Sequence, residues 1–127
     1  MSDLRSLQID GQWINQNGSI LEIIEHKGTL EGSYISRKGR MASGKNYPLI
    51  GQRNASVLAF QVNWEDEKSN LESITSFSGR LIMDPSGVPT IHTMWVLVRQ
   101  WEDQDQKKPT GAWNSFLTNA DTFVPMD

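Results

Sequence analysis

Eight short segments of alternating residues, separated by turn-forming residues, run through almost the whole sequence. The first starts at Gly11, and the others cover 19–25, 29–36, 47–53, 56–64, 71–83, 88–99 and 112–124. None of them shows sustained helical periodicity. Strands at such regular spacing are typical of an antiparallel sandwich or barrel. We predict an all-β protein with a single domain over residues 1–127, folded as an eight-stranded antiparallel up-and-down β-barrel.

The composition narrows the classes of function. The chain has a net charge of −3, which gives no reason to expect a nucleic-acid or membrane partner. It contains no cysteine, so disulfides and thiolate chemistry are excluded. No apolar run approaches the roughly 20 residues of a membrane-spanning helix, and the first ten residues do not resemble a signal peptide.

The first predicted strand leads into a turn that carries polar side chains. Trp13 and Asn15 are two residues apart, so they share one face of the strand. The dipeptide Asn17-Gly18 readily takes the positive φ angles of a two-residue hairpin turn, and Ser19 opens the next strand. We expect Asn15 and Ser19 to face the same space at the rim of the barrel, with the Trp13 indole in the core below them.

Alternation also predicts which side chains point into the barrel. These are Leu21, Tyr34, Ser36, Phe60, Val62, Trp64, Ser73, Thr75, Phe77, Ile91, Thr93, Trp95 and Asp121. The set mixes aromatic rings with hydroxyls and a carboxylate. Because an unpaired buried polar group costs about 1–3 kcal/mol, the pattern favours a polar ligand inside the barrel. The alternative is that these groups pair with one another and with buried water.

Several motifs in order resemble the avidin–streptavidin family. The family's opening Gly-x-Trp-x-Asn-x-x-Gly-Ser is matched by Gly11, Trp13, Asn15, Gly18 and Ser19, although lipocalins also begin with Gly-x-Trp. Later matches are Gly32, Tyr34 and Ser36; Trp64, Ser73, Thr75, Phe77 and Gly79; Thr93, Trp95 and Leu97; and Trp113, Asp121, Thr122 and Phe123.

The resemblance implies non-covalent, high-affinity binding of biotin in the barrel mouth, which sequesters that ligand, with no other cofactor. Asn15, Ser19 and Tyr34 match the family's donors to the ureido oxygen, and Asp121 and Ser36 match the acceptors for the two ureido N–H groups. Trp64, Phe77 and Trp95 match the aromatic walls, Thr75 the hydroxyl near the thioether, and Ser73 a contact to the tail carboxylate. Tyr34 could instead be a core tyrosine, and Asp121 a strand-end cap.

The resemblance also extends to assembly and location. Trp113 matches a tryptophan that closes a neighbouring subunit's site, which implies a homotetramer, and the family implies a secreted protein. The basic loop at 37–46 is about two residues longer than its streptavidin counterpart, and it matches a loop that folds over the ligand. Arg40, Ser43 and Lys45 are candidates there for the biotin carboxylate. Trp101 has no counterpart.

The alternatives to biotin binding are a carrier of another small ligand and an enzyme. A lipocalin-like carrier of another small ligand has the same fold, but it predicts an apolar interior and usually cysteines. An enzyme is not expected, because the two histidines, His26 and His92, have no Ser or Asp partner at a spacing typical of a catalytic triad. The sequence has no metal-ligand cluster either.

Overall fold

The computed structural model describes residues 3–36, 45–64, 72–99 and 115–126. Eight strands follow a short 3₁₀ turn, η1 (Leu4–Ser6). They are β1 (Gly11–Asn15), β2 (Ile20–His26), β3 (Thr29–Ile35), β4 (Asn46–Asn54), β5 (Val57–Asn63), β6 (Ser73–Met83), β7 (Pro89–Arg99) and β8 (Phe116–Pro125). The predicted all-β class is therefore confirmed.

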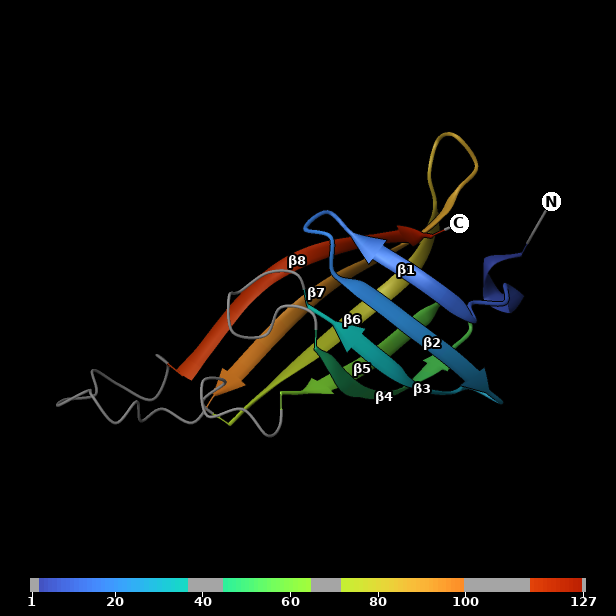
Figure 1. The fold of residues 1–127 in the computed structure, drawn as a ribbon. Coiled ribbons are helices and arrows are strands. Elements are labelled where there is room, and N and C mark those ends of the chain that lie inside the picture. The colour runs from blue at the N-terminus through green and yellow to red at the C-terminus, as the bar shows by residue number, and fades with distance from the viewer. Residues whose placement is uncertain (1–2, 37–44, 65–71, 100–114, 127) are drawn as a thin grey trace, which may run out of the picture.

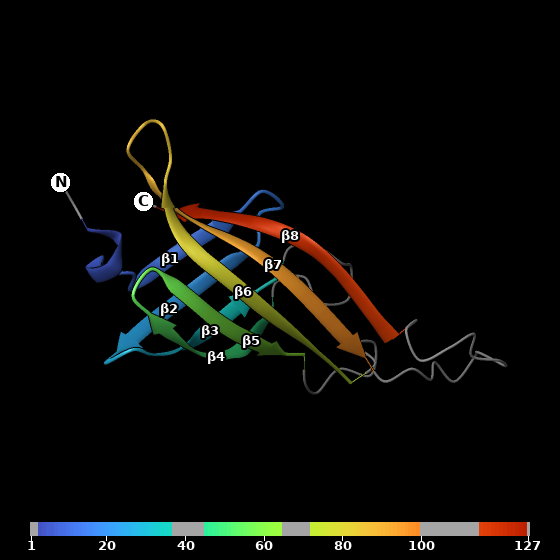
Figure 2. The ribbon, with the colours of Figure 1, turned by 180° about the vertical axis from the view of Figure 1, so that it is seen from behind.

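The strands form one closed antiparallel barrel in sequence order (Figure 1). Each strand pairs with the next, and β8 returns to pair with β1, so the sheet has no free edge. The closing seam is the shortest ladder, with three residue pairs from Trp13–Pro125 to Asn15–Phe123. Seen from behind, β5 to β8 lie side by side, and β6 to β8 are the longest strands (Figure 2).

The turn after β1 differs from the two-residue hairpin that Asn17-Gly18 suggests. The backbone N–H of Asn15 donates to Ser19 O, which leaves three residues in the loop, and Gly18 alone takes a positive φ, of 84°. The Asn15 side chain explains the longer loop, because its Oδ1 accepts from the N–H groups of Asn17 and Ser19, each at 2.9 Å. A two-residue turn with both φ angles positive occurs instead at Lys27-Gly28.

The interior follows the predicted alternation. Leu21, Ile23, Leu30, Phe60, Val62, Leu81, Ile91 and Phe123 are all at most 3% exposed. Gly32, in β3, marks a place where two strands approach closely. Its φ is 155°, and a Cβ there would lie 1.8 Å from the carbonyl oxygen of Glu22 on β2. Only glycine fits, and the close contact lets the sheet curve as a small barrel requires.

One end of the barrel is filled by the segment that precedes β1, which we call the N-terminal plug (residues 4–9). Leu4 and Leu7 pack against the core, and Ile9 is completely buried. The indole Nε1 of Trp13 donates to Ile9 O at 3.0 Å, which places Trp13 in the core as expected. Figure 1 shows η1 beside the start of β1, at the end of the barrel where β2 finishes.

Arg53, at the end of β4, holds the plug in place. Its side chain is 5% exposed and forms an ion pair with Glu25, with Nη1 and Oε1 2.8 Å apart. The same guanidinium donates to the carbonyls of Leu4, Leu7 and Ala55. These contacts satisfy a buried cation with a carboxylate and backbone dipoles, as burial of a charge requires.

Candidate functional site

The opposite end of the barrel opens into a cavity of about 530 Å³, which we call the mouth cavity. It lies at the end of the barrel where β1, β3 and β7 finish, and its walls are both polar and aromatic. The residues that line it are Asn15, Gln16, Asn17, Ser19, Tyr34, Ser36, Trp64, Thr75, Phe77, Trp95, Leu97, Leu117, Asn119, Ala120 and Asp121. This is a usual size for a small-molecule pocket.

The β1–β2 turn fixes the direction in which the Asn15 amide points. Because Oδ1 accepts from two backbone N–H groups, the NH₂ group is directed away from the turn. One of its hydrogens goes to Asp121, with Nδ2 and Oδ2 3.3 Å apart. An amide NH₂ has two hydrogens, and the other serves the hydrogen bond with the Tyr34 hydroxyl.

Tyr34 lies next to this turn. Its hydroxyl is hydrogen-bonded with the side chains of Ser19 and Asn15, and its ring is 5% exposed. Burial, and then the negative charge of Asp121, raises the pKa of Tyr34 to about 12, despite the two hydrogen bonds that act in the opposite direction. The phenol is therefore neutral over the whole physiological range and can act as a hydrogen-bond donor. Asn15, Ser19 and Tyr34 form one group of polar side chains, drawn from β1, the β1–β2 turn and β3.

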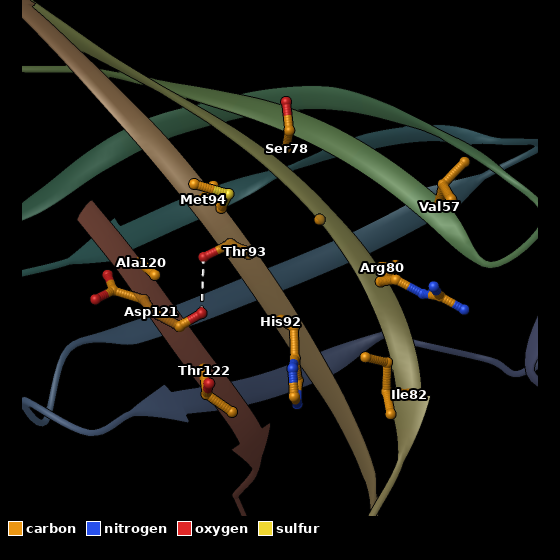
Figure 3. A pocket seen from close by; sticks show the side chains of 11 residues that line it. Val57, Ser78, Arg80, Ile82, His92, Thr93, Met94, Ala120, Asp121 and Thr122 are labelled. Atoms are coloured by element: carbon orange, nitrogen blue, oxygen red, sulfur yellow. Dashed lines mark hydrogen bonds between the residues drawn. The ribbon is translucent and has the colours of Figure 1, made fainter. Parts of the chain in front are cut away.

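Asp121 faces this group from β8. Its side chain is buried, at 9% exposed, and its two oxygens accept from different amides. Oδ2 accepts from Asn15, and Oδ1 accepts from Nε2 of Gln16 at 2.7 Å. Its backbone is held as well, since Oγ1 of Thr93 donates to Asp121 O at 2.9 Å (Figure 3). An ionised carboxylate has about four acceptor positions, so it can still accept a further N–H.

Aromatic rings form the walls of the mouth cavity. Trp64 packs edge-on against Tyr34, with ring centroids 5.4 Å apart, and against Tyr47 at 4.9 Å. Phe77 stacks on Phe60 at 4.6 Å. The Trp64 indole Nε1 donates to Oγ1 of Thr75 at 2.8 Å, so the Thr75 hydroxyl keeps its own hydrogen for another acceptor. These contacts hold the rings in place before any ligand enters.

The structure brings together most of the side chains that the sequence singled out. Those that line the mouth cavity are Asn15, Ser19, Tyr34, Ser36, Trp64, Thr75, Phe77, Trp95 and Asp121. Ser73 is buried but does not line it. Trp113, Trp101 and the loop candidates Arg40 and Ser43 lie outside the described residues, whereas Lys45 is described and exposed.

Three features of the site were missed at the sequence level. Gln16 was not singled out, although it contacts Asp121 directly. Leu117 and Asn119 also line the mouth cavity, and their alternation with Asp121 on β8 could have identified them. Trp95 carries a buried indole N–H that has no acceptor among the described residues.

The part of the chain that the structure describes holds no group of three or more His, Cys, Asp or Glu side chains placed to bind a metal ion. Within those residues there is likewise no helix of the length and hydropathy needed to cross a membrane.

A closed eight-stranded barrel with a polar and aromatic cavity at one end defines the chain as a small-ligand-binding barrel. A sequence profile of the Avidin family matches residues 4–126, and the chain belongs to that family. It is 32% identical to afifavidin of Afifella pfennigii over 72% of this chain, and 30% identical to avidin of Gallus gallus over 73%. The matches span 58% and 64% of those two proteins, so the chain covers about three-fifths of each.

Solved structures agree with this assignment. Apo shwanavidin superposes with a TM-score of 0.76 at 30% identity, covering 94% of this chain and 100% of the other. A rhizavidin–biotin complex superposes with a TM-score of 0.74 at 27% identity, covering 94% and 93%. The similarity to solved structures therefore extends over nearly the whole barrel and includes its mouth.

Proposed function

We propose that this protein binds biotin non-covalently in the mouth cavity, one molecule per chain. The observation that carries the proposal is the convergence of three potential donors, on Asn15, Ser19 and Tyr34, opposite a buried carboxylate acceptor on Asp121. Biotin presents the complementary groups on one ring, since its ureido oxygen is an acceptor and its two ureido N–H groups are donors. Membership of the Avidin family and the rhizavidin–biotin complex support the same ligand.

The chemistry of the pocket explains why binding should be tight. Three donors on one oxygen polarise the ureido group, and cooperative hydrogen bonds strengthen one another in a low-dielectric cavity. The polarised N–H groups then donate to Asp121 and Ser36, and a charged acceptor gives the stronger bond. The bicyclic ring is held between Trp64, Phe77 and Trp95, and the Thr75 hydroxyl faces the thioether. Because the rings and turn are already fixed, little side-chain entropy is lost on binding.

Binding without reaction is the activity that this arrangement supports. The titratable groups of the mouth cavity, Tyr34 and Asp121, serve the ligand as donor and acceptor, and neither lies beside a nucleophile–base pair. We propose a non-enzymatic role in which the protein, secreted from the cell, sequesters biotin. Cell fractionation would test the location.

Isothermal titration calorimetry tests the central proposal. Biotin titrated into the protein at micromolar concentrations should bind with a stoichiometry of one per chain and a Kd well below about 1 μM, equivalent to more than about 8 kcal/mol. A fatty acid serves as the matched control for a lipocalin-like carrier. Heat with the fatty acid and none with biotin would favour the carrier and contradict biotin binding.

We also propose that the protein forms a homotetramer, built as a dimer of dimers. The outer face of β7 and β8 carries exposed apolar side chains: Met94, Val96, Val98, Phe116 and Val124. Beside them, Figure 3 shows a hollow over β5 to β8 that is lined by Val57, Arg80, Ile82, His92, Met94 and Thr122 among others. An apolar strip on a sheet face is typical of an interface between protein chains.

Trp113 gives a direct test of assembly, because the family resemblance assigns it to a neighbouring subunit's site. Trp113→Lys should speed biotin dissociation and weaken the assembly together, since loss of a large buried side chain costs about 3 kcal/mol or more. Light scattering combined with biotin off-rates measures both. An unchanged assembly and off-rate would show that Trp113 is not at a subunit interface.

A further inference from the structure

Gln16 is the one residue of the β1–β2 turn whose side chain crosses to β8. Its Nε2 donates to Oδ1 of Asp121 at 2.7 Å, with a longer contact of 3.5 Å to Ala120 O. Its Oε1 accepts from the backbone N–H of Thr122 at 3.0 Å. The side-chain amide thus contacts three consecutive residues of β8, one of them through its carboxylate.

These contacts lie just beyond the last backbone pair between β1 and β8, the two strands that close the barrel. The β1–β8 ladder ends at Asn15–Phe123, and beyond it β1 turns away into the loop. The backbone N–H of Thr122 and the carbonyl of Ala120 both point toward the seam from β8. An amide side chain has one acceptor and two donors, so Gln16 can pair with both and still donate to Asp121.

We propose that Gln16 is a positioning residue for the ligand, which holds the Asp121 carboxylate in the orientation that receives a ureido N–H. This inference rests on the proposed biotin function. The Gln16–Asp121 bond is the shorter of the two that this carboxylate accepts from side-chain amides, at 2.7 Å against 3.3 Å for Asn15. That length is typical of a charge-assisted hydrogen bond, which is about twice as strong as a neutral one.

The geometry defines what the loss of Gln16 should do. Without its amide, Asp121 keeps a single long bond from Asn15 and can rotate about its χ angles. A ligand must then order this carboxylate when it binds, which weakens the complex mainly through faster dissociation. Since Gln16 also ties the turn to β8, the role in orienting Asp121 has to be separated from a purely structural role.

Two substitutions at Gln16 make that separation. Gln16→Met has a similar length and removes both the donor and the acceptor. Gln16→Glu keeps the acceptor for the Thr122 N–H but replaces the donor to Asp121 with a second carboxylate. Both should raise the biotin dissociation rate about 10- to 100-fold, and Gln16→Glu at least as much as Gln16→Met. Gln61→Glu, an exposed outward position on β5, is the matched control and should leave the rate unchanged.

A double-mutant cycle with Asp121→Asn distinguishes an effect of Gln16 through the carboxylate from a purely structural effect on the dissociation rate. If Gln16 acts through the carboxylate, Gln16→Met should change the dissociation rate less than about twofold in the Asp121→Asn background. The same loss in both backgrounds would overturn the proposal. So would a dissociation rate in the single Gln16→Met variant that matches the wild type.

Amide hydrogen exchange at Thr122 supplies a measurement that needs no ligand. Gln16→Met should accelerate exchange there, because the acceptor of that N–H is removed, and unchanged protection would overturn the contact itself.

Different results would contradict the proposed function and the proposed role of Gln16. If the wild type does not bind biotin, the proposed function fails and the role of Gln16 fails with it. If the wild type binds tightly and the cycle shows no coupling, only the role of Gln16 fails.

Discussion

The two ends of the barrel differ in whether their buried polar groups use all of their hydrogen-bonding capacity within the chain. At the plugged end, the Arg53 guanidinium is paired with Glu25 and with four backbone carbonyls, so its hydrogen-bonding capacity is used within the chain. At the mouth, Asn15, Tyr34 and Asp121 contact one another, yet the Tyr34 hydroxyl and the Asp121 carboxylate retain capacity for a further bond. These groups are paired at both ends, as is usual for buried polar groups, whereas the buried Trp95 indole N–H at the mouth has no acceptor among the described residues.

The difference shows how one small barrel can separate stability from function. A polar group that is satisfied within the chain contributes to folding and offers nothing to a ligand. A group with unused capacity contributes less to folding, and the ligand completes its hydrogen bonds. Substitutions at the plugged end should therefore change the free energy of unfolding, and substitutions at the mouth should change the affinity for biotin.

Arg53→Met should have the largest effect, and on stability. Removing the guanidinium leaves the Glu25 carboxylate and buried carbonyls without their donor, so the free energy of unfolding should fall by about 3–5 kcal/mol. Urea denaturation measures this. Arg5→Met removes an exposed ion pair with Asp3 and is the control, with little expected change because water and salt screen exposed charges. Equal losses in the two variants would show that Arg53 does not hold the plug.

Asp121→Ala should have the next largest effect, and on binding. It leaves a ureido N–H buried without an acceptor, which should weaken biotin binding by about 2 kcal/mol or more, mostly through faster dissociation. The free energy of unfolding without biotin should change much less. A variant with the wild-type off-rate would show that the carboxylate does not contact the ligand.

Alkaline pH should affect the mouth through Tyr34. An unfolded tyrosine has a pKa of about 10, whereas that of Tyr34 is raised to about 12 in the fold. The stabilisation from keeping the phenol neutral is complete below pH 10, and it is lost as the pH rises through 12, by up to about 1.4 kcal/mol per unit. Urea denaturation at several pH values measures the decline, and the difference between wild type and Tyr34→Phe isolates this group. Identical profiles would contradict the assignment.

The smallest effects should come from replacing a tryptophan with phenylalanine, once at each end of the barrel. Trp13→Phe removes the donor to Ile9 O, and Trp64→Phe removes the donor to Thr75. Each lost hydrogen bond is worth about 1 kcal/mol. Trp13→Phe should lower the free energy of unfolding with unchanged biotin affinity, and Trp64→Phe should lower the affinity. Calorimetry measures the biotin affinity of both variants, and urea denaturation measures their free energies of unfolding. The reversed pattern would contradict the difference between the two ends.

The sequence predicted the fold well because alternation is a local signal. It identified the eight strands and the inward faces, including the polar side chains of Tyr34 and Asp121. The motif matches then suggested the role of each side chain, which alternation alone could not do. Strand ends were less accurate: β6 begins at Ser73, after Glu72 takes a positive φ of 48° that no pattern reveals.

The contacts of Gln16 and Arg53 that the sequence did not predict are mainly long-range. Gln16 was not recognised because its partner, Asp121, lies 105 residues further along the chain, and nothing local marks a glutamine in a turn as a partner of a carboxylate. In the sequence, Arg53 looks like any charged residue at the end of a strand. Nothing near it in the chain indicates that it donates to carbonyls of the N-terminal plug. Such contacts depend on which strands close the barrel, and only the folded chain defines that.

The turn between β6 and β7 lies at the far end of the barrel from the mouth cavity, and this has a practical consequence. A hydrogen bond from Gly87 N–H to Asp84 O, at 2.9 Å, closes this turn, and Pro85, Ser86 and Gly87 are exposed. Thr75 and Leu97, on the same two strands, line the cavity at the other end. Exposed loop tips tolerate insertions well. A peptide inserted after Ser86 would anchor the protein to a solid support from the end of each barrel opposite its mouth cavity.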